Sequence, residues 1–202
     1  MGISIGTVAL EEAVFLAPMS GVSDLPFRRL VKRLGAGLVV SEMIASEAMI
    51  RETRQSMTMA KSCADEQPMA VQLAGCEPRV MAEAAKLNAD RGARIIDINF
   101  GCPVKKVVNG QAGSALMRNE THAARILEAT VKAVDLPVTL KMRTGWDDRN
   151  RNAPTCPHCR SMRHPHDHRA RPHPLSILCR LGRLELYPPG EGSRCYSGRR
   201  KR

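Results

Sequence analysis

Short apolar runs alternate with amphipathic stretches between Val14 and Gly145. Five runs rich in Val, Ile, Leu and Ala end at a turn or polar residue, and we predict them to be strands at residues 14–17, 37–43, 69–73, 94–100 and 138–142. Three stretches with apolar residues at helical spacing are predicted to begin as helices near Asp24, Pro78 and Asn119. Short strands separated by helical connections form parallel β/α units, which occur in doubly wound sheets and in (β/α)₈ barrels.

The first predicted helix separates apolar from basic residues. Its apolar face is expected to contain Leu25, Phe27, Leu30, Val31 and Leu34. Its solvent-facing side is expected to contain Arg28, Arg29, Lys32 and Arg33, with Gly35 ending the helix. The Met-rich stretch 44–60 further along the chain has a less regular pattern.

The turn after the first predicted strand distinguishes the two architectures. A dinucleotide-binding sheet has a glycine fingerprint at this turn, whereas the chain has residues 17–21 with the sequence APMSG. The barrel is therefore favoured. A complete barrel needs about 250 residues, and this chain of 202 residues shows only about five of the eight β/α units. We expect an α/β fold that is a partial (β/α)₈ TIM barrel with two open sheet edges.

The composition changes after Pro154. Residues 155–202 have neither a helical nor a strand period, and they hold 11 of the 31 basic residues but only three acids. Most of the net charge of +11 lies in this tail, so the basic composition does not mark the whole chain as a nucleic-acid binder. We expect residues 1–154 to be the N-terminal part of a barrel domain. Residues 155–202 are expected to be an irregular or disordered tail, for which a shifted reading frame is one explanation.

The tail contains a candidate zinc motif. Cys156 and Cys159 have the spacing of a ligand pair, and His164, His166 and His168 follow. The separation is far shorter than the roughly 12 residues of a zinc finger, and no apolar residues are placed to form a core around the site. We therefore expect no metal. A non-enzymatic nucleic-acid- or zinc-binding role for the tail stays an alternative.

Other features restrict the class of protein. No apolar run reaches the roughly 18 residues of a transmembrane helix, and Glu11 and Glu12 interrupt an N-terminus that lacks the basic region of a signal peptide. The seven cysteines are odd in number and scattered, which does not fit a disulfide framework. We expect a cytoplasmic protein with no membrane contact and no stable protein partner.

Residues 95–117 carry the candidate chemistry. The fourth predicted strand leaves Cys102 at its carboxyl end, where parallel α/β enzymes hold their reactive groups. Lys105 and Lys106 follow, together with a glycine-containing loop that allows another molecule to approach the backbone. A buried, unreactive cysteine is the alternative interpretation, and the neighbouring cations and glycines favour the reactive one.

Four segments carry a family resemblance: residues 16–28 (LAPMSGVSDLPFR), 71–75 (VQLAG), 97–103 (DINFGCP) and 140–146 (LKMRTGW). Together, in this order and spacing, they resemble the tRNA-dihydrouridine synthases, with the closest likeness to the bacterial branch first described beside nitrogen-regulation genes. The resemblance covers roughly residues 13–154. It implies reduction of particular uridines in tRNA, with FMN as cofactor and NADPH as reductant. It also implies a barrel that holds the flavin and a small C-terminal helical domain that helps to grip the RNA.

The resemblance also implies roles for individual residues. Those expected to contact the flavin are Pro18, Met19, Ser20, Gln72 and Lys141. Cys102 is expected to donate a proton to the uracil ring, and Asn99 is expected near the target base. Lys105, Lys106 and Arg143 are candidates to bind the RNA substrate, with ordinary solvated surface charges as the alternative interpretation. A lysine near N1 of a reduced flavin would stabilise its negative charge, and a thiol can act as a general acid, so residue types and roles agree.

Two further expectations remain open. The family's later strands, with their histidine and glycine-rich phosphate donors, have no counterpart in residues 155–202, so we expect weak or no FMN binding and impaired activity. The alternative enzyme is an FMN barrel oxidoreductase that acts on a small molecule, as the dihydropyrimidine and dihydroorotate reducers do.

Overall fold

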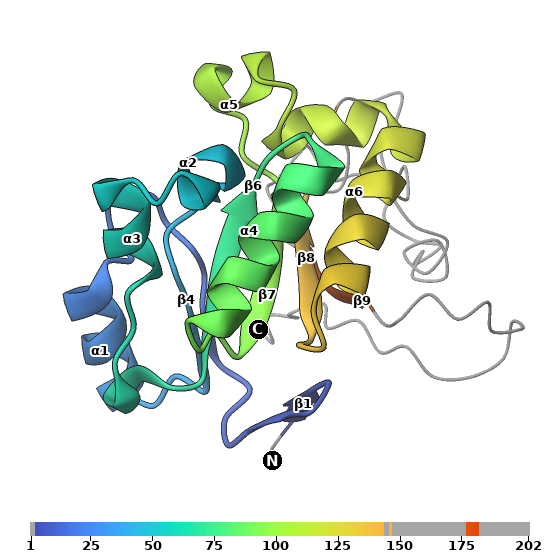
Figure 1. Ribbon diagram of the computed structural model, residues 1–202. Helices are drawn as coiled ribbons and strands as arrows, with labels where there is room; N and C mark the ends of the chain where they lie inside the picture. Colours follow the sequence, from blue (N-terminus) through green and yellow to red (C-terminus); the bar gives the residue numbers. More distant parts are fainter. Residues whose placement is uncertain (1–2, 144–145, 147–176, 182–202) are drawn as a thin grey trace, which may run out of the picture.

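The computed structural model describes residues 3–143, Trp146 and residues 177–181. Its main sheet has the strand order β3 (Phe15–Leu16), β4 (Leu38–Val40), β6 (Met69–Ala74), β7 (Ile95–Phe100), β8 (Val138–Met142) and β9 (Ile177–Leu181), and β5 (Ile44–Ala45) also pairs with β6. All pairs in this sheet are parallel except that of β8 with β9. Five strands lie at the positions that the sequence predicts, and the curved parallel sheet with alternating helices confirms the partial barrel (Figure 1).

Local signals explain where the main helices begin. In α1 (Leu25–Arg33), the side chain of Asp24 accepts a hydrogen bond from the Phe27 amide, as an N-cap residue does. Pro78 opens α4 (Pro78–Asp90), where its missing N–H costs nothing. Asn119 caps α6 (Glu120–Ala133) through the His122 amide. These helix starts confirm the sequence prediction.

Two apolar cores lie on opposite faces of the sheet. The larger core joins the outward-facing side chains of β6, β7 and β8 to α4 and α6, which lie side by side over these strands (Figure 1). The smaller core joins Leu38, Val40, Ala70 and Ile95 of the inner face to the antiparallel hairpin of β1 (Ile3–Ile5) and β2 (Val8–Leu10). The hairpin lies at the end of the sheet opposite to α5 (Lys105–Asn109), so it covers the inner face near the strand starts (Figure 1). The inner face near the strand ends carries the polar side chains.

The predicted faces of α1 are partly wrong. Arg28 is 1% exposed rather than solvent-facing, whereas Leu30 and Leu34, which were expected on the buried face, are 46% and 79% exposed. The physical reason is a buried carboxylate, Glu66, which pairs with Arg28 and holds that side of the helix against the fold.

The structure also contains elements that the sequence pattern does not predict. The stretch 44–60 forms β5, α2 (Ser46–Ile50) and α3 (Arg54–Ala60). Two short 3₁₀ helices, η1 (Ala64–Glu66) and η2 (Gly113–Arg118), lie further along the chain. Within the tail, residues 177–181 form β9 along the outer edge of β8, so the prediction of irregular structure and of an open edge does not hold there. The remaining tail residues, including the candidate zinc ligands, lie outside the described residues.

Two searches of the described residues gave no candidates. No helix in this part of the chain combines the length and the apolar character needed to cross a membrane. Within the same residues, no group of three or more His, Cys, Asp and Glu side chains is arranged to hold a metal ion.

Candidate functional site

Three neighbouring strands bring five polar side chains together near their carboxyl ends. Gln72 of β6 is in register with Asp97 of β7, Asp97 with Thr139 of β8, and Asn99 of β7 with Lys141 of β8. Residues two apart on a strand lie on the same face, so these side chains share the inner face of the sheet. The sequence-predicted residues Gln72, Asn99 and Lys141 are therefore neighbours.

Hydrogen bonds link four of these side chains to the backbone at Cys102, and the amide donors along them all point the same way. The Cys102 amide donates to Asn99 Oδ1 (2.9 Å), Asn99 Nδ2 donates to Gln72 Oε1 (2.8 Å), and Gln72 Nε2 donates to Asp97 Oδ2 (2.6 Å). The Thr139 hydroxyl donates to the other oxygen of Asp97. A carboxylate only accepts hydrogen bonds, so Asp97 fixes which way each amide along this relay points. The relay thereby sets the backbone at Cys102.

Burial changes the acid–base properties of the two charged groups on this face. Burial raises the pKa of Asp97 to about 6, against the opposing effects of the Thr139 and Gln72 hydrogen bonds and the Lys141 charge. Burial also lowers the pKa of Lys141, partly offset by the charge of Asp97, while the Arg143 charge lowers it further. An ammonium that is incompletely solvated and faces one carboxylate is suited to stabilise a second negative charge placed beside it.

Asp97 and Thr139 belong to this site although the sequence resemblance did not single them out. Asp97 is 1% exposed and lies within the apolar run 95–100. A carboxylate inside a strand that is buried along its whole length needs partners, and that was the available sequence signal. Thr139 carried no comparable signal, because threonine is common in ordinary strands.

Cys102 lies in a tightly packed turn after β7. Its carbonyl accepts from the Ser114 amide (3.0 Å), and Asn99 Oδ1 also accepts from the Gly101 amide (3.0 Å). Arg143 Nε donates to the Gly101 carbonyl (2.6 Å). Arg143, expected to bind RNA, thus also supports this turn. Cys102 is a free cysteine and a partly exposed residue.

Gly113 packs closely against this turn. It has φ of +61°, and a Cβ there would lie 2.7 Å from the Cys102 carbonyl oxygen and 2.9 Å from Val107 Cγ1. We expect Gly113→Ala to lower the free energy of unfolding by about 1–3 kcal/mol and to make the Cys102 thiol more reactive, because the turn must move. Urea denaturation and the rate of thiol alkylation measure the two effects.

Gly92→Ala is the control for this substitution. Gly92 has φ of +90°, but nothing lies within 4 Å of its added Cβ. Gly92→Ala therefore has the cost of a positive φ without a steric contact, and the Cys102 thiol should keep its wild-type reactivity. Equal thiol reactivity in both variants would contradict the packing role of Gly113.

Asp97 should give the chain a measurable pH dependence. Because its folded pKa lies above the ordinary value of 3.8, its contribution to stability is fully present below that value and is lost as pH rises through about 6. Lowering the pH from about 7 to about 5 should therefore stabilise the wild type by roughly 1 kcal/mol relative to Asp97→Asn. Urea denaturation of both proteins across this range checks the sign; a difference independent of pH would contradict it.

The first predicted flavin-contact segment lies at the end of β3. Pro18 is partly buried, while Met19 and Ser20 are exposed. Hydrogen bonds from the Val22 and Ser23 amides to the Met19 carbonyl close a loop, residues 19–23, and the Gly21 amide donates to Glu42 Oε2. Within the described residues, Pro18, Met19 and Ser20 make no hydrogen bond to Gln72, Asn99 or Lys141. They share only the carboxyl edge of the sheet with them.

The two predicted RNA-contact lysines lie farther along the same edge. Lys105 and Lys106 are exposed in α5, directly after the cysteine loop. Val104, which precedes them, is 56% exposed. A cationic and partly apolar surface therefore borders Cys102.

Comparisons with known proteins agree with this geometry. The sequence profile of the family described as Dihydrouridine synthase (Dus) matches residues 15–159. The chain is 68% identical over 154 residues to the probable tRNA-dihydrouridine synthase of Rickettsia prowazekii, and 67% identical over 154 residues to that of Rickettsia bellii. It is 56% identical over 153 residues to tRNA-dihydrouridine synthase B of Xanthomonas campestris.

These alignments cover 76% of this chain and 46–47% of each relative, so the chain spans about half the length of the curated relatives it matches. The family match covers both the polar inner face of the sheet and the cysteine loop. The chain belongs to the dihydrouridine synthase family.

Proposed function

We propose that this chain carries the flavin-ring and uridine-directed part of an enzyme that reduces uridines in tRNA to 5,6-dihydrouridine. The observation that supports this most is the relay that ties Cys102 to Gln72 through Asn99, which is in register with Lys141. One set of backbone and side-chain contacts thus fixes a candidate proton donor and two candidate flavin ligands relative to one another. The names of the relatives supply the substrate class.

The donors on the inner face fit the polar edge of a flavin. Gln72 uses one N–H and one lone pair within the relay, which leaves a second of each for a ligand. Lys141 would place a positive charge near the flavin N1 and C2 carbonyl, and the exposed residues Met19 and Ser20 border the same edge. When bound, FMN would supply the hydride, which it obtains from NADPH.

The chain's own residues then act on the uracil ring. In the proposed reaction Cys102 donates the thiol proton to C5 as general acid, after hydride addition at C6. Asn99 has a second amide N–H for the target base, because only one is used by Gln72. Lys105, Lys106 and Arg143 would bind RNA phosphates around a base that has been turned out of its stack.

The wider assignments rest on the same reaction. We assign residues 1–154 to the barrel domain and residues 155–202 to a separate tail, and we propose the cytoplasm, where tRNA and NADPH are available. We assign the hydrogen-bond donors among the described residues to the flavin ring rather than to its phosphate.

Flavin binding by the purified chain tests the proposal. Because the proposed contacts are to the ring alone, we expect weak binding, with affinities for riboflavin and FMN within about threefold of each other, and we expect Lys141→Met to weaken both by about tenfold. Lys86→Met, on the exposed side of α4, is the matched control and should leave binding unchanged. Quenching of flavin fluorescence measures all of these affinities.

Substrate choice is tested with the same protein. With NADPH and millimolar flavin, unmodified tRNA should gain dihydrouridine at a low rate, because we expect impaired activity in this chain, whereas free uracil should not be reduced; the product is detected after nuclease digestion. Faster turnover of uracil would favour a small-molecule oxidoreductase instead. Absence of flavin binding at millimolar flavin would overturn the proposal for this chain.

A further inference from the structure

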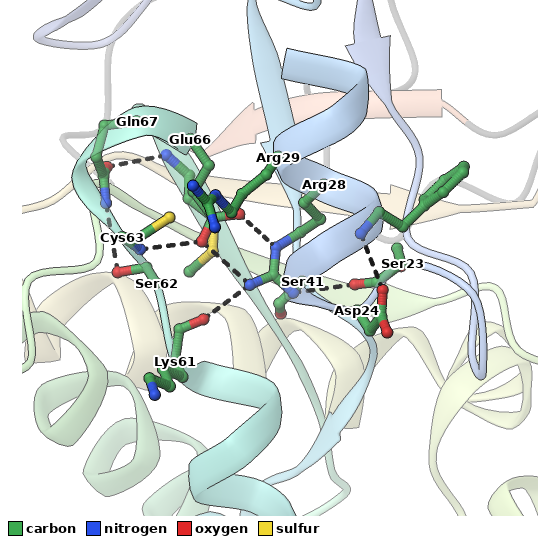
Figure 2. A network of polar contacts seen from close by, with 12 residues as sticks. Ser23, Asp24, Arg28, Arg29, Ser41, Lys61, Ser62, Cys63, Glu66 and Gln67 are labelled. Atoms are coloured by element: carbon green, nitrogen blue, oxygen red, sulfur yellow. Dashed lines mark hydrogen bonds and ion pairs between the residues drawn. The ribbon is translucent and has the colours of Figure 1, made fainter. Parts of the chain in front are cut away.

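Arg28 is a fully buried arginine whose contacts connect three segments of the chain. Its Nε and Nη2 donate to the two oxygens of Glu66 (2.8 and 3.2 Å), and both side chains are at most 1% exposed. Nη2 also donates to the Lys61 carbonyl (2.7 Å) at the end of α3. Figure 2 shows the Arg28 side chain extending from α1 toward the segment that carries Lys61, Cys63 and Glu66. Four of the five guanidinium N–H groups are satisfied in this way when the contact to Ser23 is included.

The contact to Ser23 reaches the 19–23 loop. Arg28 Nη1 donates to the Ser23 carbonyl at 2.9 Å. Ser23 is fully buried, and its hydroxyl both accepts from the Met19 amide (2.9 Å) and donates to the Met19 carbonyl (3.0 Å). A change at the guanidinium therefore reaches Met19 through one residue. The loop end next to α1 is held by Arg28, and its exposed tip by Glu42.

The residue type matters for this connection. A guanidinium is planar, keeps its charge, and presents donors in fixed directions, so it can hold a carboxylate on one edge and carbonyls on the others. A lysine in its place would bring a single point of charge and could not bridge all three segments. Glu66 is fixed in turn by the Cys63 amide (3.2 Å), so the anchor itself is rigid.

We propose that Arg28 is a positioning residue that fixes the 19–23 loop, and with it the backbone of Met19 and Ser20, for contact with the flavin. The flavin contact rests on the proposed function, whereas the fixing of the loop rests on the hydrogen bonds alone. Arg28 does not touch the flavin ring in this proposal. It acts through Ser23.

Amide hydrogen exchange and flavin binding test the proposal together. The variant Arg28→Met/Glu66→Met removes both buried charges, so neither is left unpaired and the sheet is expected to stay folded. In this variant the Met19, Val22 and Ser23 amides should exchange at least about tenfold faster, and riboflavin should bind about tenfold more weakly. The amides of β6, β7 and β8 should keep their wild-type protection.

Arg29→Met is the matched control, because Arg29 is the next residue of α1 and its pair with Asp65 is exposed. It should change neither the loop exchange nor the flavin affinity. Wild-type exchange of the 19–23 loop in a double variant with a protected sheet would overturn the proposal. A loop that exchanges faster while riboflavin affinity is unchanged would overturn its link to the flavin.

The unaltered chain provides a second measurement. Because one guanidinium holds both segments, the Ser23 and Cys63 amides should exchange with the same dependence on low urea concentrations. Independent opening of the loop would overturn the proposal even if no variant folds. If the wild type binds no flavin, the proposed function fails, and the exchange experiments still decide whether Arg28 fixes the loop.

Discussion

Replacing Cys102 with alanine is expected to slow uridine reduction by about 10²–10⁴-fold, the usual contribution of a positioned general acid. Cys102 is a partly exposed residue, and its backbone is held by Asn99 and Ser114 rather than through the thiol. Alanine should therefore leave the turn and the flavin affinity unchanged. A single-turnover assay with excess chain over tRNA measures the step that the thiol serves.

Cys76→Ala is the control for this experiment. Cys76 is also a free, partly exposed cysteine, and it follows β6 rather than β7. Burial raises the pKa of its thiol, with the charges of Glu47 and Glu77 adding to the effect, so it is a poor nucleophile and a poor acid near neutrality. Equal rates of uridine reduction for Cys102→Ala and wild type would mean that Cys102 is not the proton donor.

Much of the sheet and part of the site could be predicted from the sequence because both follow local patterns. A short apolar run bounded by turn residues is enough to identify a buried strand, as in β6, β7 and β8. Parallel strands place their carboxyl ends at one edge, so Gln72, Asn99 and Lys141 were expected near one another, and the register confirms it.

The features that the sequence did not predict depend on contacts between distant residues. Arg28 was assigned to the solvent because the basic residues of α1 look alike, and only the fold brings Glu66, 38 positions away, to meet it. The β1–β2 hairpin has no long period, and its role of covering the inner face exists only once β4, β6 and β7 are assembled. The pairing of β9 with β8 likewise joins segments far apart in the chain.

Among the interactions described here, we expect the loss of the buried Arg28–Glu66 ion pair, which joins distant parts of the chain, to lower the free energy of unfolding most. We expect Glu66→Gln to lower the free energy of unfolding by about 3–5 kcal/mol, because a neutral amide leaves a buried guanidinium without its counter-charge. The amide also presents an N–H where Arg28 offers another donor, so one of the two hydrogen bonds must be lost. Urea denaturation near neutral pH measures the change.

Asp65→Asn is the matched control, since Arg29–Asp65 is built from the adjacent residues of α1 and η1 and its side chains are about half exposed. Solvent screens this pair, and its loss should change stability little. Arg28→Met/Glu66→Met should then be more stable than Glu66→Gln alone, because it leaves no buried charge behind. Equal losses for Glu66→Gln and Asp65→Asn would mean that burial does not set the strength of the pair. A double variant as unstable as the single one would mean that the carbonyl contacts to Ser23 and Lys61, rather than the charge pair, hold these segments together.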